Sequence, residues 1–491
     1  MAFLLSLLLW LSGSYGRSQT LPNGGKAVYT LIHGSLLTDD CPICDHVTAP
    51  VPMWGSFELR LISQGPLFLN YAIENVQFST PPGGRSYKVT GKGTYRIGGQ
   101  LAVQQDLALD LMIDNGQTNA PCQFTNVTSM VTGLWPMVQV QAGQSNGTLV
   151  QQYTLDIDAA PFREIWFSTG SNFQASVWNA PSNAISGGDL LASSGRVVKR
   201  NSQLIGALGI QPLVPDLGVK DIDILADGEI VFSVEQNAFS ETLGQLSSED
   251  LLSDRGRIVR HTTPDLVKNF QPTTPLPALV GLQAVQVRDD GQTYFSVQNP
   301  FKSGKLGITV QPGDLLSDQG NIVRSGRDLL AAFSPKDPLT DVGLKVVYVW
   351  PSGEIWFSTR DGFADTNGVV FGAGDLLSDR GYVVLSNAEL LAAFSPTSGT
   401  TNDLGLDALF VVSDVTPLIG SASTIAVQAG GSANADAILS RSKGSRLFQL
   451  EGASNVLGPF SPIGSITTDT LLTDPGAITN QLQRFYRLHQ W

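Results

Sequence analysis

The segment GEIWFSTRDGFADTNGVVFGAGDLLSDRG (Gly353–Gly381) decides the fold, because both of its ends recur along the chain. The EIWFS-type strings carry a phenylalanine at intervals of 65, 63 and 62 residues, at Phe167, Phe232, Phe295 and Phe357. A string ending in Asp-Leu-Leu follows each of them, with its aspartate at Asp189, Asp250, Asp314 and Asp375. Four recurrences in one order indicate an internal repeat.

Two further strings belong to the same repeat. LLAAFSP occurs at Leu329–Pro335 and Leu390–Pro396, with weaker versions at Leu204–Leu208 and Leu266–Phe270. Its spacing is helical but covers barely two turns, so we expect a short helix between strands. The fourth string precedes EIWFS and is typical of a strand: LGVKDIDIL, VGLQAVQV, VGLKVVYV and LGLDALFVV.

Each repeat offers about four strands. Asp-Gly or Ser-Gly separates the first two strands in the complete repeats, and DLLSDRG predicts a second hairpin with a left-handed glycine. Four strands cannot bury both sheet faces alone, so neighbouring repeats must supply the missing core. Four-stranded units in series form a propeller or a β-solenoid, and we favour a propeller-like arrangement.

The strand count makes closure of the repeat array testable. The repeat region has four EIWFS-type strands but five candidates for the strand that precedes them in a repeat. In a closed ring, Gly405–Val411 pairs with Glu164–Ser168, and Gln152–Ile157 belongs to the preceding domain. In an open array, Gln152–Ile157 pairs with Glu164–Ser168 instead. We favour the closed ring, since it removes an exposed sheet edge.

Pattern and composition divide the rest of the chain. Residues 1–16 have the apolar run and small residues of a secretory signal peptide. Residues 27–160 alternate like a β-sandwich or barrel-like domain, and 161–414 hold the four repeats. The Gly/Ala/Ser-rich stretch 415–440 predicts a linker with one strand at Thr424–Gln428, and 441–491 a small C-terminal β-module. We therefore expect an all-β protein.

Composition limits the partners. The 491 residues are 42% hydrophobic and only 15% charged, with a net charge of −13. Such a chain has enough apolar material for large cores, and its negative charge disfavours nucleic acid and anionic membranes as partners. No stretch after residue 16 has the roughly 20 apolar residues of a membrane span. We expect a protein that is secreted or on the cell surface.

The three cysteines leave alternatives open. Cys41 and Cys44 form a CPIC motif, and Cys122 lies far downstream. We favour one structural disulfide, either between Cys41 and Cys44 or from one of them to Cys122, as an oxidising compartment allows. A zinc site with His33 or His46 and a redox motif are the alternatives.

No pattern of catalytic residues is present. The chain has four histidines and no GxSxG, HExxH or P-loop motif. The run Asp221-Ile222-Asp223 superficially suggests a calcium loop. The positions that match its two aspartates are Ala284 and Gln286, then Val346 and Tyr348, then, allowing for slippage, Asp407 and Leu409, so the ligand set does not recur. We therefore expect no catalytic, metal-binding or cofactor-binding residue and no cofactor.

Aromatic residues at one strand position are weak candidates for stacking on a ligand. They are Trp166, Tyr294 and Trp356. Exposed, they would form a platform for sugars, but packing between blades is the interpretation that we favour.

The repeat string GEIWFST…GDLLSDRG…ELLAAFSP…LGLDAL resembles repeats of secreted bacterial proteins, over Arg163–Val412. The ending FQLEGASNVLGPFSPI…QRFYRLHQW is similar to the fibronectin-III-like modules of exported bacterial proteins, over Ile419–Trp491. The first resemblance implies propeller-like blades, and both imply export. Neither implies a reaction.

Together these observations predict an exported, non-catalytic β-repeat protein. It would bind a surface, a glycan or an extracellular protein through loops of the repeat domain. A secreted hydrolase or lyase with its site on propeller loops is the alternative. Converging acids in a deep central pocket favour the enzyme, and a shallow face with exposed aromatics favours binding.

Overall fold

Strands dominate the structure, a computed structural model of the chain, so the predicted all-β class is confirmed. The structure describes residues 26–44, 48–81, 86–100, 102–131, 137–176, 183–214, 216–273, 280–397, 403–415, 425–429, 437–441, 445–475 and 483–491. The expected signal peptide at 1–16 lies outside these residues. The chain divides into two compact units, Met1–Arg163 and Glu164–Trp491.

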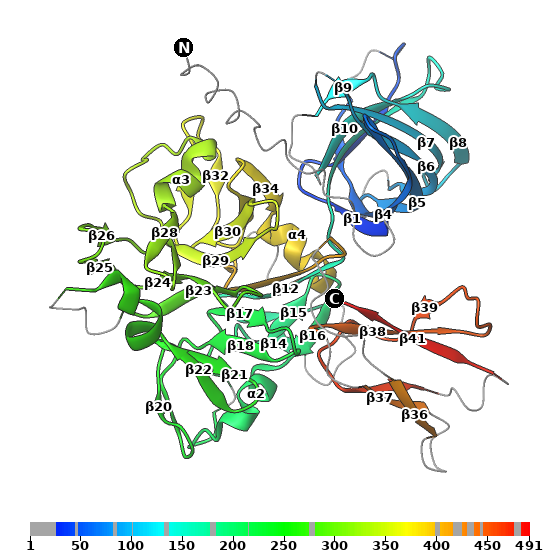
Figure 1. The fold of residues 1–491 in the computed structure, drawn as a ribbon. Helices are drawn as coiled ribbons and strands as arrows, with labels where there is room; N and C mark the ends of the chain where they lie inside the picture. Colours follow the sequence, from blue (N-terminus) through cyan, green and yellow to red (C-terminus); the bar gives the residue numbers. More distant parts are fainter. Residues whose placement is uncertain are drawn as a thin grey trace, which may run out of the picture. The chain divides into compact units, whose positions relative to one another are not determined.

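The first unit is an antiparallel sheet that closes on itself (Figure 1). Its strands are β1 (Lys26–Leu31), β2 (Leu36–Asp40), β3 (Val51–Pro52), β4 (Trp54–Gln64), β5 (Phe68–Ser79), β6 (Lys88–Gly98), β7 (Gln104–Asp114), β8 (Asn119–Thr125), β9 (Ser129–Met130), β10 (Val138–Gln144) and β11 (Gln152–Ala160). The order β1-β4-β5-β6-β7-β8-β10-β11 is closed because β11 pairs back onto β1. Such an order is that of a barrel.

Alternating side chains fill the inside of this closed sheet. In β7, every second residue from Gln105 to Ile113 is buried, as expected for a strand with one face in a core. Stacked rings of Tyr29 and Phe57, with centroids 5.4 Å apart, contribute to the filling. A cavity among the inward-facing side chains holds about 10 Å³, which is too small for an organic ligand.

The second unit begins with four sheets of four strands each (Figure 1). Their second, third and fourth strands come from one repeat each. The sheets are β35 (Ala408–Val412), β12 (Glu164–Ser168), β15 (Leu190–Ala192) and β16 (Arg196–Lys199); β17 (Asp221–Ile224), β18 (Ile230–Ser233), β21 (Asp250–Ser253) and β22 (Arg257–His261); β23 (Leu282–Val287), β24 (Thr293–Val297), β27 (Leu315–Ser317) and β28 (Asn321–Arg324); and β29 (Leu344–Val349), β30 (Ile355–Thr359), β33 (Leu376–Ser378) and β34 (Tyr382–Leu385).

The strand pairing that the closed ring requires is confirmed. The last strand of the repeats, β35, pairs antiparallel with β12, from Glu164 opposite Val412 to Ser168 opposite Ala408. Gln152–Ile157 lies in β11 and pairs with β10 and β2 of the first unit. The first strands β35, β17, β23 and β29 also contact one another in cyclic order, so they form the centre of the ring.

Each repeat adds a two-stranded ribbon that the sequence analysis did not anticipate. The ribbons lie between the second and third strands of their repeats, and they are β13 (Phe173–Gln174) with β14 (Ala184–Ile185), β19 (Ala238–Ser240) with β20 (Gly244–Leu246), β25 (Phe301–Lys302) with β26 (Thr309–Val310), and β31 (Phe363–Ala364) with β32 (Val370–Phe371). They account for part of the length of the repeat.

The short helices expected from LLAAF are present after the fourth strands. They are α2 (Asn201–Leu204) with η1 (Gly206–Leu208), η2 (Thr262–Leu266) with η3 (Lys268–Phe270), α3 (Gly326–Leu330) with η4 (Ala331–Phe333), and α4 (Asn387–Leu391) with η5 (Ala392–Phe394). Their terminal aromatic residue packs edge-on against the EIWFS phenylalanine of the following repeat: Phe270 on Phe295, Phe333 on Phe357, and Phe394 on Phe167. The last pair joins the fourth repeat to the first.

Two three-stranded sheets end the second unit. They are β36 (Ile425–Ala429), β37 (Ala437–Arg441) and β40 (Leu471–Asp474), and β39 (Ser461–Pro462), β38 (Phe448–Ala453) and β41 (Phe485–Gln490). The strand expected at Thr424–Gln428 within the linker is present as β36, but 415–440 also supplies most of β37, so this stretch is not only a linker. Pairing with β40 stabilises these strands despite their small-residue composition.

Candidate functional site

A pocket of about 330 Å³ lies where the four central strands end. It is lined by residues at or just after the ends of β17, β23, β29 and β35, together with Arg446, Leu447 and Trp491 from the C-terminal module. The volume is at the lower end of the roughly 300–1,000 Å³ that is usual for small-molecule sites.

Aromatic side chains form one wall of this pocket. The rings of Tyr348 and Trp350 meet edge to face with centroids 5.1 Å apart, and Tyr348 meets Phe410 in the same way at 6.5 Å. Trp350 also packs on Trp356 at 4.8 Å. Contacts among the rings fix their orientation, so the wall is preformed.

The C-terminal module holds the opposite wall in place. The backbone of Arg446 and Leu447 donates to the carbonyl of Trp491, and the Trp491 indole donates to the buried Asp414 at 3.0 Å. Leu447 and Trp491 also belong to the apolar core that contains Phe410. Packing and hydrogen bonds therefore anchor the module on the ring.

Charged groups lie beside the aromatic wall. Arg446 is ion-paired with Asp289, and Arg288 lies 3.4 Å from Asp290. Asp223 accepts hydrogen bonds from the amides of Ile224 and Val287. Burial raises the pKa of Asp223 to about 6, although Arg446 and these amides act in the opposite direction.

Two buried donors at this pocket have no acceptor in the described part of the chain. They are the indole Nε1 of Trp350 and the Nε of Arg446. A buried donor without a partner costs about 1–3 kcal/mol, and more when it is charged. Ligand oxygen atoms that accept from these groups would remove that cost. Both residues line the pocket, next to its aromatic wall.

At the opposite end of the central strands, polar side chains contact one another. Lys220, Gln283, Lys345 and Asp407 occupy the same position in the four repeats. Lys345 pairs with Asp407 at 3.0 Å, and Lys220 donates to Gln298 at 3.0 Å. Burial lowers the pKa of Lys220 to about 8.

The same register corrects the repeat alignment by one residue. In the strand register, Asp223 lies opposite Val231, and Phe410 lies opposite Trp166. Val231 and Trp166 occupy the same repeat position, so Phe410, and not Leu409, matches Asp223. Asp407 therefore matches Lys220 rather than Asp221. The glycine that the four strings share, at Gly218, Gly281, Gly343 and Gly405, gives the same register as the strand pairing.

Carboxylates inside the ring serve as links between repeats. The buried Asp221 accepts from the amides of Ile222, Val285 and Leu409, so it joins three of the four central strands. Burial raises its pKa well above the usual range. No group of three or more His, Cys, Asp or Glu side chains is placed to hold a metal ion within the described ranges.

The stacking candidates from the sequence are not in the pocket. Trp166 and Trp356 are fully buried, so the idea that they stack on a ligand is wrong. Their indoles donate to the buried carboxylates of Glu164 and Glu354, at 2.8 and 3.0 Å. Tyr294 is half-buried beneath Arg288.

The cysteines lie in the first unit. Cys41 and Cys44 form a disulfide with Cα atoms 5.2 Å apart, and Cys122 is a buried free thiol on β8. Burial raises the pKa of the Cys122 thiol, which keeps it protonated and unreactive. His46 lies outside the described residues. No helix among the described residues is long and apolar enough to cross a membrane.

The residues of the pocket were missed from sequence because they are not alike. One repeat position is occupied by Leu225, Arg288, Trp350 and Val412, of which the last three line the pocket. A search for side chains that recur in every repeat passes over such a position. The signal available in the sequence was that the residue at this position differs from repeat to repeat.

No protein-family model matches the chain, and no curated protein matches it either.

Proposed function

We propose that this protein is an exported, non-catalytic binding protein that holds a neutral saccharide in the pocket at the end of its central strands. The observation that carries the proposal is the pairing of a preformed aromatic wall with two buried donors that have no acceptor among the described residues.

A sugar ring matches this chemistry on both sides. Its C–H face packs on aromatic rings, and its oxygens accept from Trp350 Nε1 and Arg446 Nε. Its hydroxyl hydrogens have Asp289 and Asp290 as acceptors on the same lining. The lining carries three aspartates and two arginines, so a neutral ligand suits it better than an anionic one.

The first experiment measures binding of methyl glucoside, methyl galactoside and methyl mannoside to the full chain by saturation-transfer NMR and calorimetry. Trp350→Phe keeps a ring but removes the indole donor, so the affinity for the bound sugar should fall about 2- to 10-fold. Arg446→Met removes a charged donor and should cost about 10- to 100-fold.

Trp54→Phe is the matched control. Trp54 lies in the first unit and its indole Nε1 is also buried without an acceptor among the described residues. This variant should bind sugar as the parent does. No binding of any of the three sugars at millimolar concentration, or equal loss in the control, contradicts the proposal.

A hydrolase is the second candidate, and the pKa of Asp223 favours it. A carboxyl group with a pKa of about 6 is suited to donate a proton to a glycosidic oxygen. Hydrolysis of nitrophenyl glycosides that disappears in Asp223→Asn would establish the enzyme. Sugar binding without turnover would leave the binding protein as the function.

Export and architecture belong to the same proposal. The closed cyclic order of four antiparallel sheets supports a four-bladed propeller, and the two three-stranded sheets support a fibronectin-III-like module.

The apolar run in 1–16 supports a cleaved signal peptide. Sequencing the N-terminus of the protein recovered from the medium tests export, and an intact residue 1 contradicts cleavage.

A further inference from the structure

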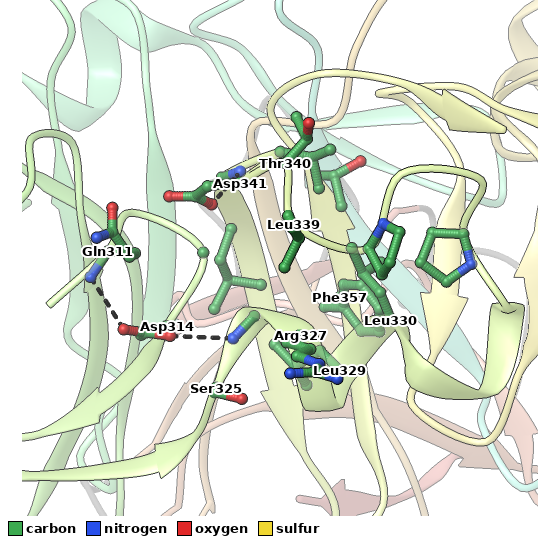
Figure 2. Close-up of a pocket in the computed structure, with 18 residues that line it drawn as sticks. Gln311, Asp314, Ser325, Arg327, Leu329, Leu330, Leu339, Thr340, Asp341 and Phe357 are labelled. Atoms are coloured by element: carbon green, nitrogen blue, oxygen red, sulfur yellow. Dashed lines mark hydrogen bonds between the residues drawn. The ribbon is translucent and has the colours of Figure 1, made fainter.

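A second cavity, of about 200 Å³, lies between the third and fourth repeats (Figure 2). It shares no lining residue with the pocket at the end of the central strands. Its apolar walls consist of Leu329 and Leu330 of α3, Leu339 of the following loop and Phe357 of β30. Asp314 lies at its polar side and accepts from the amides of Gln311 and Gly326.

The first and fourth repeats fill the equivalent position with an asparagine side chain. Asn201 donates to the carbonyl of Gly188 at 3.1 Å and accepts from the amide of Leu217 at 3.0 Å. Asn387 makes the same two bonds, to Gly374 at 3.4 Å and from Leu404 at 3.1 Å. One carboxamide thus bridges a carbonyl and an amide in each of these repeats.

The second repeat satisfies the same two groups in another way. The hydroxyl of Thr262 donates to the carbonyl of Glu249 at 2.9 Å, and the carboxylate of Glu249 accepts from the amide of Val280 at 2.7 Å. Three repeats therefore use side chains to cap this carbonyl and this amide, although the residues differ.

The third repeat has no side chain for this task. Glycine stands at Gly326, the position of Asn201 and Asn387 at the start of the helix. Among the described residues, the carbonyl of Gly313 and the amide of Val342 have no hydrogen-bond partner. Both residues line the cavity.

A third polar group in the cavity is also without a partner in the described part of the chain. The hydroxyl of Thr359 is buried and makes no hydrogen bond. Its counterpart in the first repeat, Thr169, donates to the carbonyl of Ser171 at 2.9 Å. The cavity thus presents one donor, one acceptor and one hydroxyl within apolar walls.

We propose that this cavity binds a small molecule that carries a primary carboxamide on an apolar body. The ligand's NH₂ donates to Gly313 and its carbonyl accepts from Val342, as the asparagines do in the first and fourth repeats. The neighbouring carboxylates of Asp314 and Asp341 disfavour a carboxylate ligand in the same place.

Three probes of one shape test the proposal on the full chain: isobutyramide, isobutyric acid and 3-methyl-2-butanone. We expect isobutyramide to bind at least 10-fold more tightly than the ketone, which lacks the NH₂ group, and than the acid. The amide signals of Val342 and Gly326 should shift in NMR titrations. Equal affinity for all three, or no binding of the amide, overturns the proposal and leaves an apolar or water-filled cavity.

Variants separate this site from other surfaces. Gly326→Asn supplies the missing carboxamide and should abolish binding. A Cβ atom at Gly326 would lie 2.9 Å from the Gly313 carbonyl, so the backbone must shift slightly. Thr359→Val needs no such shift, and it should weaken isobutyramide binding several-fold; unchanged affinity in this variant contradicts the proposal.

Asn387→Gly is the matched control in the fourth repeat. It should open an equivalent site, so the stoichiometry of bound isobutyramide should rise from one to two. The added amide should also restore part of the thermal stability that this substitution removes. A stoichiometry that stays at one contradicts the assignment of the carboxamide position.

Discussion

Phe394 is the residue whose removal tests the closed ring most directly. It is fully buried at the end of η5, and its ring meets Phe167 and Phe173 edge-on at 6.4 and 6.0 Å. Both partners belong to the first repeat. In a closed ring Phe394→Ala breaks an internal contact, whereas in an open array the same residue would lie at a free end.

The expected loss of stability follows from the burial of the Phe394 side chain. Replacing a buried phenylalanine by alanine costs about 3–5 kcal/mol. For a cooperative unit of 150–250 residues each kcal/mol lowers the melting temperature by about 2–4 °C, so we expect a fall on the order of 10 °C. Phe270→Ala removes the same contact between the second and third repeats and should cost a similar amount.

Differential scanning calorimetry of the full chain provides the assay. The transition that contains the repeats should shift equally in both variants, and the transition of the first unit should stay in place. Leu339→Ala is the control, since this leucine is 85% exposed. If Phe394→Ala shifts the transition no more than this control does, the closed ring carries no stability and the reasoning is refuted.

Three further predictions follow from the described contacts. Because the pKa of Asp223 is about 6 in the folded state and about 3.8 in the unfolded chain, its stabilisation is complete below pH 3.8 and disappears as the pH rises through 6. Urea unfolding should thus show about 1 kcal/mol more stability at pH 5 than at pH 7, a gain that Asp223→Asn should lack. Mass spectrometry after alkylation of the native, non-reduced protein should find Cys41 joined to Cys44 and Cys122 modified only after unfolding; a labelled Cys41 would contradict this. The fragment 163–227, expressed alone, should give a poorly dispersed NMR spectrum, since its faces are covered by neighbouring repeats.

Local sequence predicted the elements of the repeat well. EIWFS and Asp-Leu-Leu became β-strands in every repeat because β-branched and aromatic residues favour strands that pack on both faces. LLAAF became a short helix because Ser325 and Ser386 cap its start and Phe333 and Phe394 bury its end. The failure to predict β37 within 415–440 has the opposite cause, since pairing partners far along the chain decide whether small residues form a strand.

The candidate sites were hidden from the sequence because each depends on a difference between repeats. Trp350 stands where the other repeats have leucine, arginine or valine, and Gly326 stands where two repeats have asparagine. Composition and motif searches detect residues that recur in the repeats, so they miss a position at which one repeat differs. A missing side chain becomes a cavity only when the surrounding backbone is held in place by the other repeats.

The sequence by itself determined the all-β class and the fourfold repeat, and it limited the partner of Glu164–Ser168 to two candidate strands, because short-range pattern and strand count carry that information. The tertiary structure alone decided which pairing occurs, which aromatic residues are buried and which polar groups are left without partners. These outcomes depend on contacts between residues hundreds of positions apart, such as Ser168 with Ala408. Burial and hydrogen bonding are properties of the folded neighbourhood, and a residue's own type does not fix them.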